Sequence, residues 1–344
     1  MPESGPTPNL PPACTPTPPV PTPPTPTPGT PAPTTSAVTP APTPTPTVDD
    51  LRQNAITAII DGLGADATYQ QRQQINAPVA AYLKAVAARH PIASSYNIVV
   101  LYDMTQITQQ DADSIYEAVT SFPEKGKPIL LVVHSPGGSI AGAYLIGKML
   151  QEHTGKLVIV VPRRAKSAAT LLCCAAREIH MGSLSELGPI DPQIKDMPAL
   201  GLKDSIEHLA TLVSTYPKSA DMFAQYLKGA LQLIDLGYYE RVAESAVQYA
   251  ERCLAPHQKS LSQPSGKIAH DLVHSFKDHG FVIDAKEATA IFGGNVIKTK
   301  TVEYALGNDL YGTLGQIERL ARMLNHGFYL IGDLGAEPTF TPKK

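Results

Sequence analysis

Residues 128–139 read PILLVVHSPGGS. An unbroken apolar run over 128–133 is followed by His134 and Ser135 and then by a proline and two glycines. An apolar run of this length, rich in β-branched residues, is typical of a strand that is buried on both faces of a sheet. The residues from Gly138 to Leu150 then follow a helical pattern. The stretch therefore predicts a strand, a tight turn and a helix in succession.

The same unit recurs on both sides of this stretch. Before it, the apolar run NIVVLYDM (97–104) is followed by Thr108, which with Asp111 three residues later indicates the start of a helix. Strands that alternate with helices predict an α/β fold with right-handed crossovers and buried parallel strands. The strands are expected over 97–104, 128–133, 157–161 and 179–181, and the helices over 108–121, 138–150 and 167–176.

The composition divides the chain into parts. Residues 1–48 hold 19 of the 33 prolines with Glu3 as the single charged residue, which predicts a disordered Pro/Thr-rich tail. Helical periodicity and composition place the further boundaries. We expect an N-terminal helical segment over 49–93, the α/β core over 94–200, a helical C-terminal part of the same domain with oligomerisation helices over 201–335, and a short tail over 336–344.

Composition also bounds the partners. No long Lys/Arg run indicates nucleic acid, no apolar run is long enough to span a membrane, and no signal peptide is evident. The four cysteines have no metal-ligand spacing, and adjacent Cys173 and Cys174 are expected to be core residues. We therefore expect a cytoplasmic protein without a cofactor or metal.

The two glycines of the HSPGGS turn have two interpretations. Gly137 and Gly138 can form a simple tight turn, or their amides can approach a ligand closely because no Cβ intervenes. Fixed amide N–H groups beside a helix N-terminus are what an oxyanion hole requires. His134, just before this turn, is expected to be a hydrogen-bonded core residue.

The next unit places a serine at the corresponding position. Ser167 lies in RAKSAAT (164–170), where small neighbours would leave its hydroxyl accessible. Serine is also a preferred helix N-cap, so Ser167 is either a cap or a nucleophile. Because both turns follow neighbouring parallel strands, we expect their tips to meet at one edge of the sheet.

The motifs PGGS (136–139), A-x-S-A-x-T (165–170) and LGPIDPQ (187–193) together resemble the serine dehydrogenase proteinase family, a relative of signal peptide peptidase A in the Clp protease/crotonase superfamily. The resemblance implies a crotonase-like spiral of ββα units with flanking helices. It also implies a serine endopeptidase that acts without ATP and assembles as a homo-oligomer. The expected substrates are polypeptides, with membrane proteins among them. Matched by motif, Ser167 is the nucleophile and the amides of Gly137, Gly138 and Ala168 hold the oxyanion. Gly188 and Asp191 belong to a loop of the site.

The general base does not follow from these motifs. GPIDPQ lacks the histidine that Clp proteases carry in this place, and His180 comes soon after the serine on an expected strand. The resemblance to signal peptide peptidase A implies a Ser-Lys dyad instead, with Lys203 as the preferred base and Lys218 as the alternative. Lys195 is a further candidate. Lys166 is expected to be a solvated charge or an anion anchor, and Asp191 to cap a turn.

Two other function classes use the same fold. One is a crotonase-type acyl-CoA enzyme, which needs a pair of glutamates, whereas Glu186 is almost alone near the expected site. The other is a non-catalytic scaffold or peptide-binding oligomer. Helices expected near 220–236 and 238–254 carry enough apolar surface to predict oligomerisation in any of these cases.

Overall fold

The computed structural model describes residues 21, 45–194, 197–230 and 233–343. Residues 1–20 and 22–44 of the expected tail, with Cys14, lie outside the described residues, and so does Lys195. The chain divides into two units, 1–45 and 46–344, and the second contains the sheet, its covering helices and the expected site.

The second unit is built on a seven-stranded sheet in the order β11-β10-β1-β2-β3-β5-β9. The five strands from β1 to β9 are parallel to one another, as predicted, whereas β10 pairs antiparallel with β1 and with β11. The strands are β1 (Asn97–Tyr102), β2 (Ile129–His134), β3 (Leu157–Val161), β5 (Glu178–Met181), β9 (Ile297–Thr299), β10 (His326–Asp333) and β11 (Thr339–Pro342).

Alternate residues of the central strands face two separate cores. In β2, Leu131 and Val133 belong to one core while Leu130 and Val132 belong to the other. Because both faces of the strand are buried, every position of the run is apolar in the sequence. All six residues of β2 are buried.

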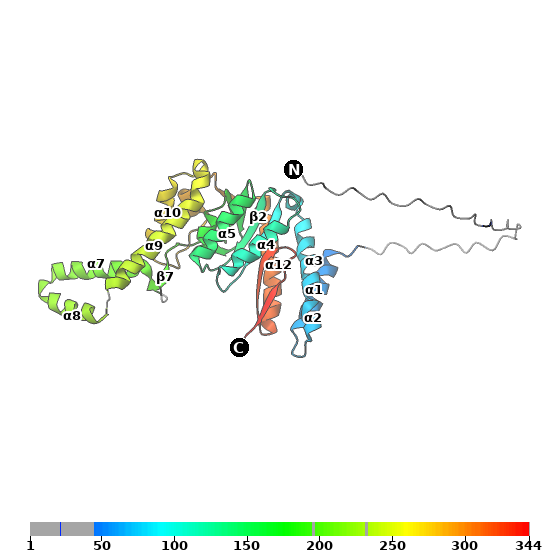
Figure 1. Ribbon diagram of the computed structural model, residues 1–344, viewed down its shortest axis with the longest axis horizontal. Coiled ribbons are helices and arrows are strands. Elements are labelled where there is room, and N and C mark those ends of the chain that lie inside the picture. The colour runs from blue at the N-terminus through cyan, green and yellow to red at the C-terminus, as the bar shows by residue number, and fades with distance from the viewer. Residues whose placement is uncertain (1–20, 22–44, 195–196, 231–232, 344) are drawn as a thin grey trace, which may run out of the picture. The chain divides into compact units, whose positions relative to one another are not determined.

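Helices cover both faces of the sheet. On one face, α1, α3 and α12 lie side by side (Figure 1). The other core is covered by α4, α5, α6, α9, α10 and α11. The helices are α1 (Val48–Leu63), α2 (Tyr69–Gln73), α3 (Asn76–Ala88), α4 (Gln110–Ser121), α5 (Ile140–His153), α6 (Ala168–Cys173), α7 (Ala199–Thr215), α8 (Ala220–Ala230), α9 (Leu233–Leu254), α10 (Ser265–His274), α11 (Ala285–Phe292) and α12 (Val302–Met323).

The mixed α/β class is therefore confirmed, and the predicted strands agree with β1, β2, β3 and β5. At the start of α4, Asp111 Oδ2 accepts a hydrogen bond from the Thr108 N–H at 2.6 Å, as half of the expected capping box. The part of the chain after β9 differs most from the expectation. There α12 is much longer than the helical pattern near 314–325 suggests, and the antiparallel strand β10 was not predicted at all.

Within the described ranges, no helix combines the length and the apolar character needed to cross a bilayer.

Candidate active site

A second row of short pairings crosses the carboxyl ends of the parallel strands. The strand β4 (Arg164–Ala165) pairs with β6 (Glu186–Leu187), and Ser135 bridges to Ala165. Leu187 in turn forms an antiparallel bridge to Ile283. Each of β3 and β5 is thus followed by its own short strand, so β3, β4 and α6 form one ββα unit of the kind that the resemblance implies. We call this second row the rim; it contains the HSPGGS turn, the serine and the LGPID loop.

The rim brings the diglycine turn directly against Ser167. Gly137 has φ of 113°, and a methyl group placed on its Cα would lie 2.8 Å from Ser167 Cβ and 2.7 Å from the Lys166 carbonyl oxygen. Gly138 has φ of 141°, and a methyl group there would lie 2.4 Å from the Ile107 nitrogen. Both positions therefore require glycine for conformation and for space. The expected meeting of the two turns is observed.

Ser167 has an unusual backbone for a residue with a side chain. Its φ of 50° and ψ of −120° lie in a region that L-residues rarely adopt. It occupies the N-cap position of α6, yet its side chain makes no capping hydrogen bond. The interpretation of Ser167 as a capping side chain is therefore wrong. Ser167 is half-buried, so the residue is held in place by the turn and keeps part of its surface open to solvent.

The backbone amides of the two turns differ in their hydrogen bonds. The Gly137 N–H already donates to Ser135 Oγ at 3.2 Å. In the part of the chain that the structure describes, neither the Gly138 N–H nor the Ala168 N–H has an acceptor. The Ala168 nitrogen is 3.1 Å from the methyl position on Gly137, so it lies at the same turn. Of the three amides predicted for the oxyanion, those of Gly138 and Ala168 are thus the two without an acceptor among the described residues, and their role stays a prediction.

Thr170 explains the last letter of the A-x-S-A-x-T motif. Its buried hydroxyl donates to the Ala165 carbonyl at 2.6 Å and accepts from the Gly188 N–H at 3.0 Å. One side chain thus joins the strand before Ser167, the helix after it and the loop of the predicted site. Gly188 is in close contact with the Lys166 side chain, where a methyl group would lie 2.6 Å from Lys166 Cδ.

Lys166 is neither solvated nor free to bind an anion, contrary to the expectation. Its side chain is only 16% exposed, and its ammonium is 3.4 Å from Glu186 Oε2. The same Nζ donates to the carbonyl oxygens of Gly280 at 3.2 Å and Phe281 at 2.7 Å. The ammonium group is therefore engaged by one carboxylate and by two backbone carbonyls of the segment after α10. Lys166 therefore ties a distant segment to the residue that precedes Ser167.

That segment contains a residue that the sequence analysis missed. His279 Nδ1 lies 2.7 Å from Asp191 Oδ1, and Gln193 Nε2 donates to Asp191 Oδ2 at 2.9 Å. Asp191 is 6% exposed, and burial raises the pKa of its carboxyl, while the bond to His279 opposes that rise. The side chain of Asp191 thus holds a histidine and a glutamine, although a turn-capping role was expected. No local sequence signal joins residues so far apart in the chain.

The two preferred lysines remain predictions. Lys203 belongs to α7, but its side chain lies outside the described residues. Lys218 lies in a 3₁₀ turn (Pro217–Ser219) and is exposed.

The other singled-out side chains are buried. His134 packs against the rings of Tyr102 and Tyr311, and no described residue is a hydrogen-bond partner of its Nδ1, so the expectation of a hydrogen-bonded core residue is wrong for this atom. Cys173 and Cys174 are core residues, as expected.

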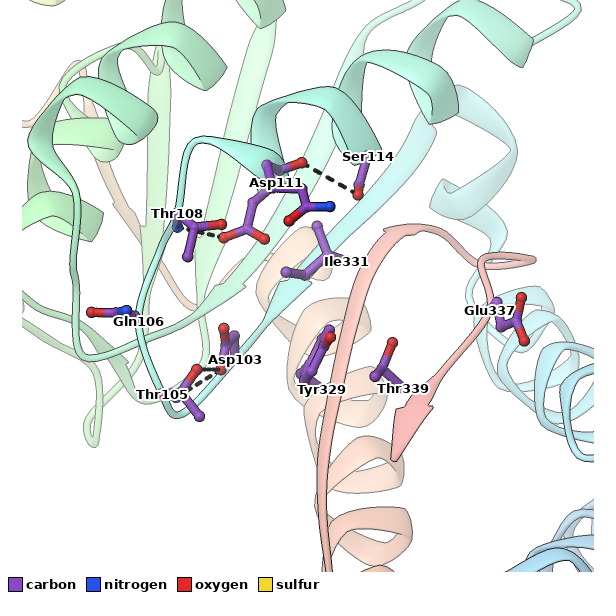
Figure 2. Close-up of a pocket in the computed structure, with 11 residues that line it drawn as sticks. Asp103, Thr105, Gln106, Thr108, Asp111, Ser114, Tyr329, Ile331, Glu337 and Thr339 are labelled. Carbon is purple, nitrogen blue, oxygen red and sulfur yellow. Dashed lines mark hydrogen bonds between the residues drawn. The ribbon is translucent and has the colours of Figure 1, made fainter. Parts of the chain in front are cut away.

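A separate polar pocket of about 360 Å³ lies behind the loop that supports the diglycine turn. Figure 2 shows three carboxylates around it, those of Asp103, Asp111 and Glu337. Asp103 Oδ1 accepts hydrogen bonds from the backbone N–H and the hydroxyl of Thr105, which shapes the loop up to Ile107. Ile107 pairs with Gly138, so this loop is a support for the turn at Ser167.

The sheet and the rim together define a class of α/β proteins. In this class a serine lies beyond the carboxyl ends of parallel strands, with two amide N–H groups that have no acceptor among the described residues. Residues 73–213 match the model of the family described as ClpP-like SDH-type serine proteinase. This match confirms the predicted resemblance over residues 73–213.

Two archaeal proteins are similar in sequence. The uncharacterized protein MJ0137 of Methanocaldococcus jannaschii is 39% identical over 192 residues, which cover 54% of this chain and 63% of that protein. The uncharacterized protein MJ1495 of the same organism is 36% identical over 189 residues, covering 54% of this chain and 62% of that protein. The chain therefore spans less than two thirds of the length of these relatives.

Two solved structures illustrate the similarity of the chain to known folds. A mutant of the 1510-N membrane-bound stomatin-specific protease aligns with a TM-score of 0.38 at 11% identity, over 73% of this chain and 97% of that one. A ClpP1 mutant from Listeria monocytogenes aligns with a TM-score of 0.36 at 16% identity, over 60% of this chain and 94% of that one.

Proposed function

We propose that this chain is a serine endopeptidase in which Ser167 attacks a peptide carbonyl and the amides of Gly138 and Ala168 bind the oxyanion. The observation that carries the proposal is the contact of the diglycine turn with Ser167, whose hydroxyl caps nothing. Each preorganised donor at an oxyanion contributes about 3–4 kcal/mol of transition-state stabilisation in comparable sites. The helix N-terminus of α6 adds a partial positive charge at the same place.

Ser167→Ala tests the proposal. We expect the variant to lose labelling by a fluorophosphonate probe and to lose casein cleavage by at least about 10³-fold, because the substitution removes the attacking oxygen. Ser245→Ala is the matched control, since Ser245 is an exposed serine of α9 that donates only to the Arg241 carbonyl. Undiminished labelling of Ser167→Ala would refute the assignment of the nucleophile.

The resemblance to signal peptide peptidase A assigns the general base to Lys203, with Lys218 as the alternative. A lysine acts as a base near neutral pH only where burial or a neighbouring cation lowers its pKa. Lys203→Ala and Lys218→Ala, assayed side by side on casein, separate the two. The exposed position of Lys218 in the free chain favours Lys203 of the pair.

The acyl-CoA alternative requires acidic side chains that are free to exchange protons. Glu186 is instead engaged by Lys166 at 3.4 Å and by Arg164 at 3.7 Å. An engaged carboxylate is a poor acid/base partner for an enolate, so peptide hydrolysis is the better use of this site. Binding of coenzyme A in a calorimeter would reverse this preference.

The proposal extends to an ATP-independent homo-oligomer in the cytoplasm that cuts polypeptides. Four large side chains in the segment from the end of α7 into α9 support an assembly surface, because each is more than half exposed: Tyr216, Met222, Tyr226 and Tyr238. Light scattering after size exclusion tests the assembly, and casein cleavage without added nucleotide tests the independence from ATP. A monomer at micromolar concentration would contradict the first.

A further inference from the structure

We propose that the polar pocket beside the loop between β1 and α4 binds an aliphatic polyamine, and that the bound cation strengthens the proposed oxyanion site. The binding itself stands on the pocket alone. The effect on activity rests on the proposed function.

The pocket carries negative charge that no positive charge of the protein balances. Eleven residues line its volume of about 360 Å³, and the three charged side chains among them are the carboxylates of Asp103, Asp111 and Glu337. Within the described ranges, none of the three forms an ion pair with a lysine, arginine or histidine. A carboxylate that is partly removed from water is stabilised by a cation at hydrogen-bond distance, so the pocket favours a cationic ligand.

Asp103 provides the most enclosed of these carboxylates. The residue is only 5% exposed, and its Oδ1 accepts hydrogen bonds from the N–H of Thr105 at 2.6 Å and from its hydroxyl at 2.8 Å. Its other oxygen, Oδ2, has no hydrogen-bond partner among the described residues, and in Figure 2 it points away from Thr105 into the pocket. A buried carboxylate oxygen without a donor is a position that an N–H group of a cationic ligand would satisfy.

Asp111 faces the same space from the start of α4. Its Oδ2 accepts the Thr108 N–H at 2.6 Å. Burial raises the pKa of the Asp111 carboxyl, the hydrogen bonding to Thr108 opposes that rise, and the negative charge of Asp103 adds to it. The two carboxylates in the wall of the pocket thus repel each other. An ammonium group between them would replace this repulsion by two attractions.

The spread of the carboxylates favours a ligand with several cationic centres. Glu337 comes from the turn between β10 and β11, and in Figure 2 it lies beyond Tyr329 and Thr339 as seen from Asp103. In the part of the chain that the structure describes, no three acidic, histidine or cysteine side chains are grouped closely enough to hold one metal ion. A polyamine has ammonium groups separated by methylene groups, so it can reach separate carboxylates while its methylenes cover the side chains of Tyr329 and Ile331.

Hydroxyl groups supply further acceptors between the carboxylates. Thr105, Thr108, Ser114 and Thr339 all line the pocket. An alkylammonium group carries two or three N–H donors, more than one carboxylate oxygen can accept. The hydroxyl oxygens therefore complete the set of acceptors that a polyamine needs when it leaves water.

The wall of this pocket also supports the diglycine turn. The Ile107 N–H donates to the Gly137 carbonyl at 2.6 Å, and the Ser139 N–H donates to the Ile107 carbonyl at 2.8 Å. A ligand held by Asp103 and Asp111 restrains the chain on both sides of Ile107. The loop then holds Gly138 more firmly, and a fixed amide N–H stabilises an oxyanion better than a mobile one. We therefore expect the polyamine to activate the enzyme.

Calorimetry of the full chain with spermidine tests the pocket. Asp103→Asn should weaken spermidine binding by about tenfold or more, because the amide keeps an oxygen for Thr105 and removes the charge. Asp113→Asn is the matched control, since Asp113 is an exposed carboxylate of α4 that does not line the pocket, and it should bind spermidine like the wild type. Equal affinity of the three proteins, or no binding at millimolar spermidine, would refute the site.

Two competing ligands test the chemical class. Displacement of spermidine by an equal concentration of magnesium chloride would show a site for any cation, and tighter binding of N-acetyl-arginine amide would show a site for a basic side chain. Either result would overturn the polyamine assignment. If Asp103→Asn does not fold, Glu337→Gln at the exposed end of the pocket replaces it and should weaken binding by about two- to fivefold. An unchanged affinity of that variant would count against the site.

The rate at which a fluorophosphonate probe labels Ser167 tests the coupling. Saturating spermidine should raise this rate by at least about fivefold in the wild type, and the same concentration should have a much smaller effect on Asp103→Asn. Tight binding with an unchanged labelling rate would refute the link to the diglycine turn. A wild type that binds spermidine but is never labelled would instead refute the proposed function and leave the pocket assignment standing.

Discussion

Gly137 and Ser167, which lie in different strand-to-helix units, are in direct contact: the position of a Cβ on Gly137 is 2.8 Å from Ser167 Cβ. The contact exists because Gly137, at φ of 113°, lets the turn fold onto the helix start that carries the serine. The geometry of the proposed oxyanion site thus depends on the absence of one methyl group.

Gly137→Ala should therefore damage both the fold and the site. The new methyl group would meet the Lys166 carbonyl at 2.7 Å, in a conformation that costs a non-glycine residue about 1–3 kcal/mol. Displacing the serine by an ångström can cost about 10²-fold in rate. Urea unfolding and casein cleavage measure the two effects. The control is Gly155→Ala, since Gly155 has open space around it and should change stability by no more than about 0.5 kcal/mol.

Thr170→Val should loosen the rim without changing the volume of the side chain. The Gly188 N–H and the Ala165 carbonyl would both lose the hydroxyl of a fully buried residue. Leaving such groups unpaired costs about 1–3 kcal/mol, measurable as a lower urea midpoint. Thr211→Val, at an exposed hydroxyl of α7, should be close to neutral. Equal effects of the two substitutions would show that Thr170 does not connect the rim.

The buried thiols should be inert in the folded protein. Burial raises the pKa of Cys173 and Cys174 far above the ordinary range and that of Cys253 to about 12. In a Cys14→Ser background at pH 8, iodoacetamide should therefore modify none of the three until urea is added, as mass spectrometry would record. Peptidase activity should survive the treatment. Rapid modification of Cys173 in the native state would make a cysteine nucleophile worth reconsidering.

His134 should make the protein less stable in mild acid. Burial lowers the pKa of His134 from 6.5 to about 4. Between these values the unfolded chain binds a proton that the folded chain does not, so stability falls as the pH drops from about 6.5 to about 4, by about 3 kcal/mol for this group. His134→Phe keeps the ring contacts with Tyr102 and Tyr311 and should reduce that slope. An unchanged slope of unfolding free energy against pH would contradict the assignment.

The central sheet could be predicted because each of its parallel core strands is a short continuous run of apolar residues in the sequence. The run ILLVV is apolar on both faces, and both faces meet a core. The strand β10 alternates between buried and half-buried residues, and its antiparallel place beside β1 follows from long-range packing that no window of sequence records. The short strands of the rim, two residues each, are below the length at which periodicity carries information.

The residues of the candidate site also fall into two groups: those that a local sequence pattern predicts and those that only the fold brings together. Ser167 and the diglycine turn stand out because small residues interrupt apolar segments at fixed places. The pair of Asp191 and His279 joins positions 88 residues apart, and neither residue is unusual in its own neighbourhood. Lys166 was misjudged because its partners include backbone carbonyls of a remote loop, which no pattern of side chains in the sequence indicates.

The pairing of β1 with β10 also orders events during biosynthesis. A ribosome that has produced the chain up to residue 300 has already made the serine, the diglycine turn and His279, yet neither α12 nor β10 exists. One face of the parallel strands is then missing a covering helix, and the hydrogen-bonding groups along one side of β1 have no neighbour. Synthesis of α12 and β10, which follows that of Ser167 and the diglycine turn, therefore sets the moment at which the nascent sheet closes.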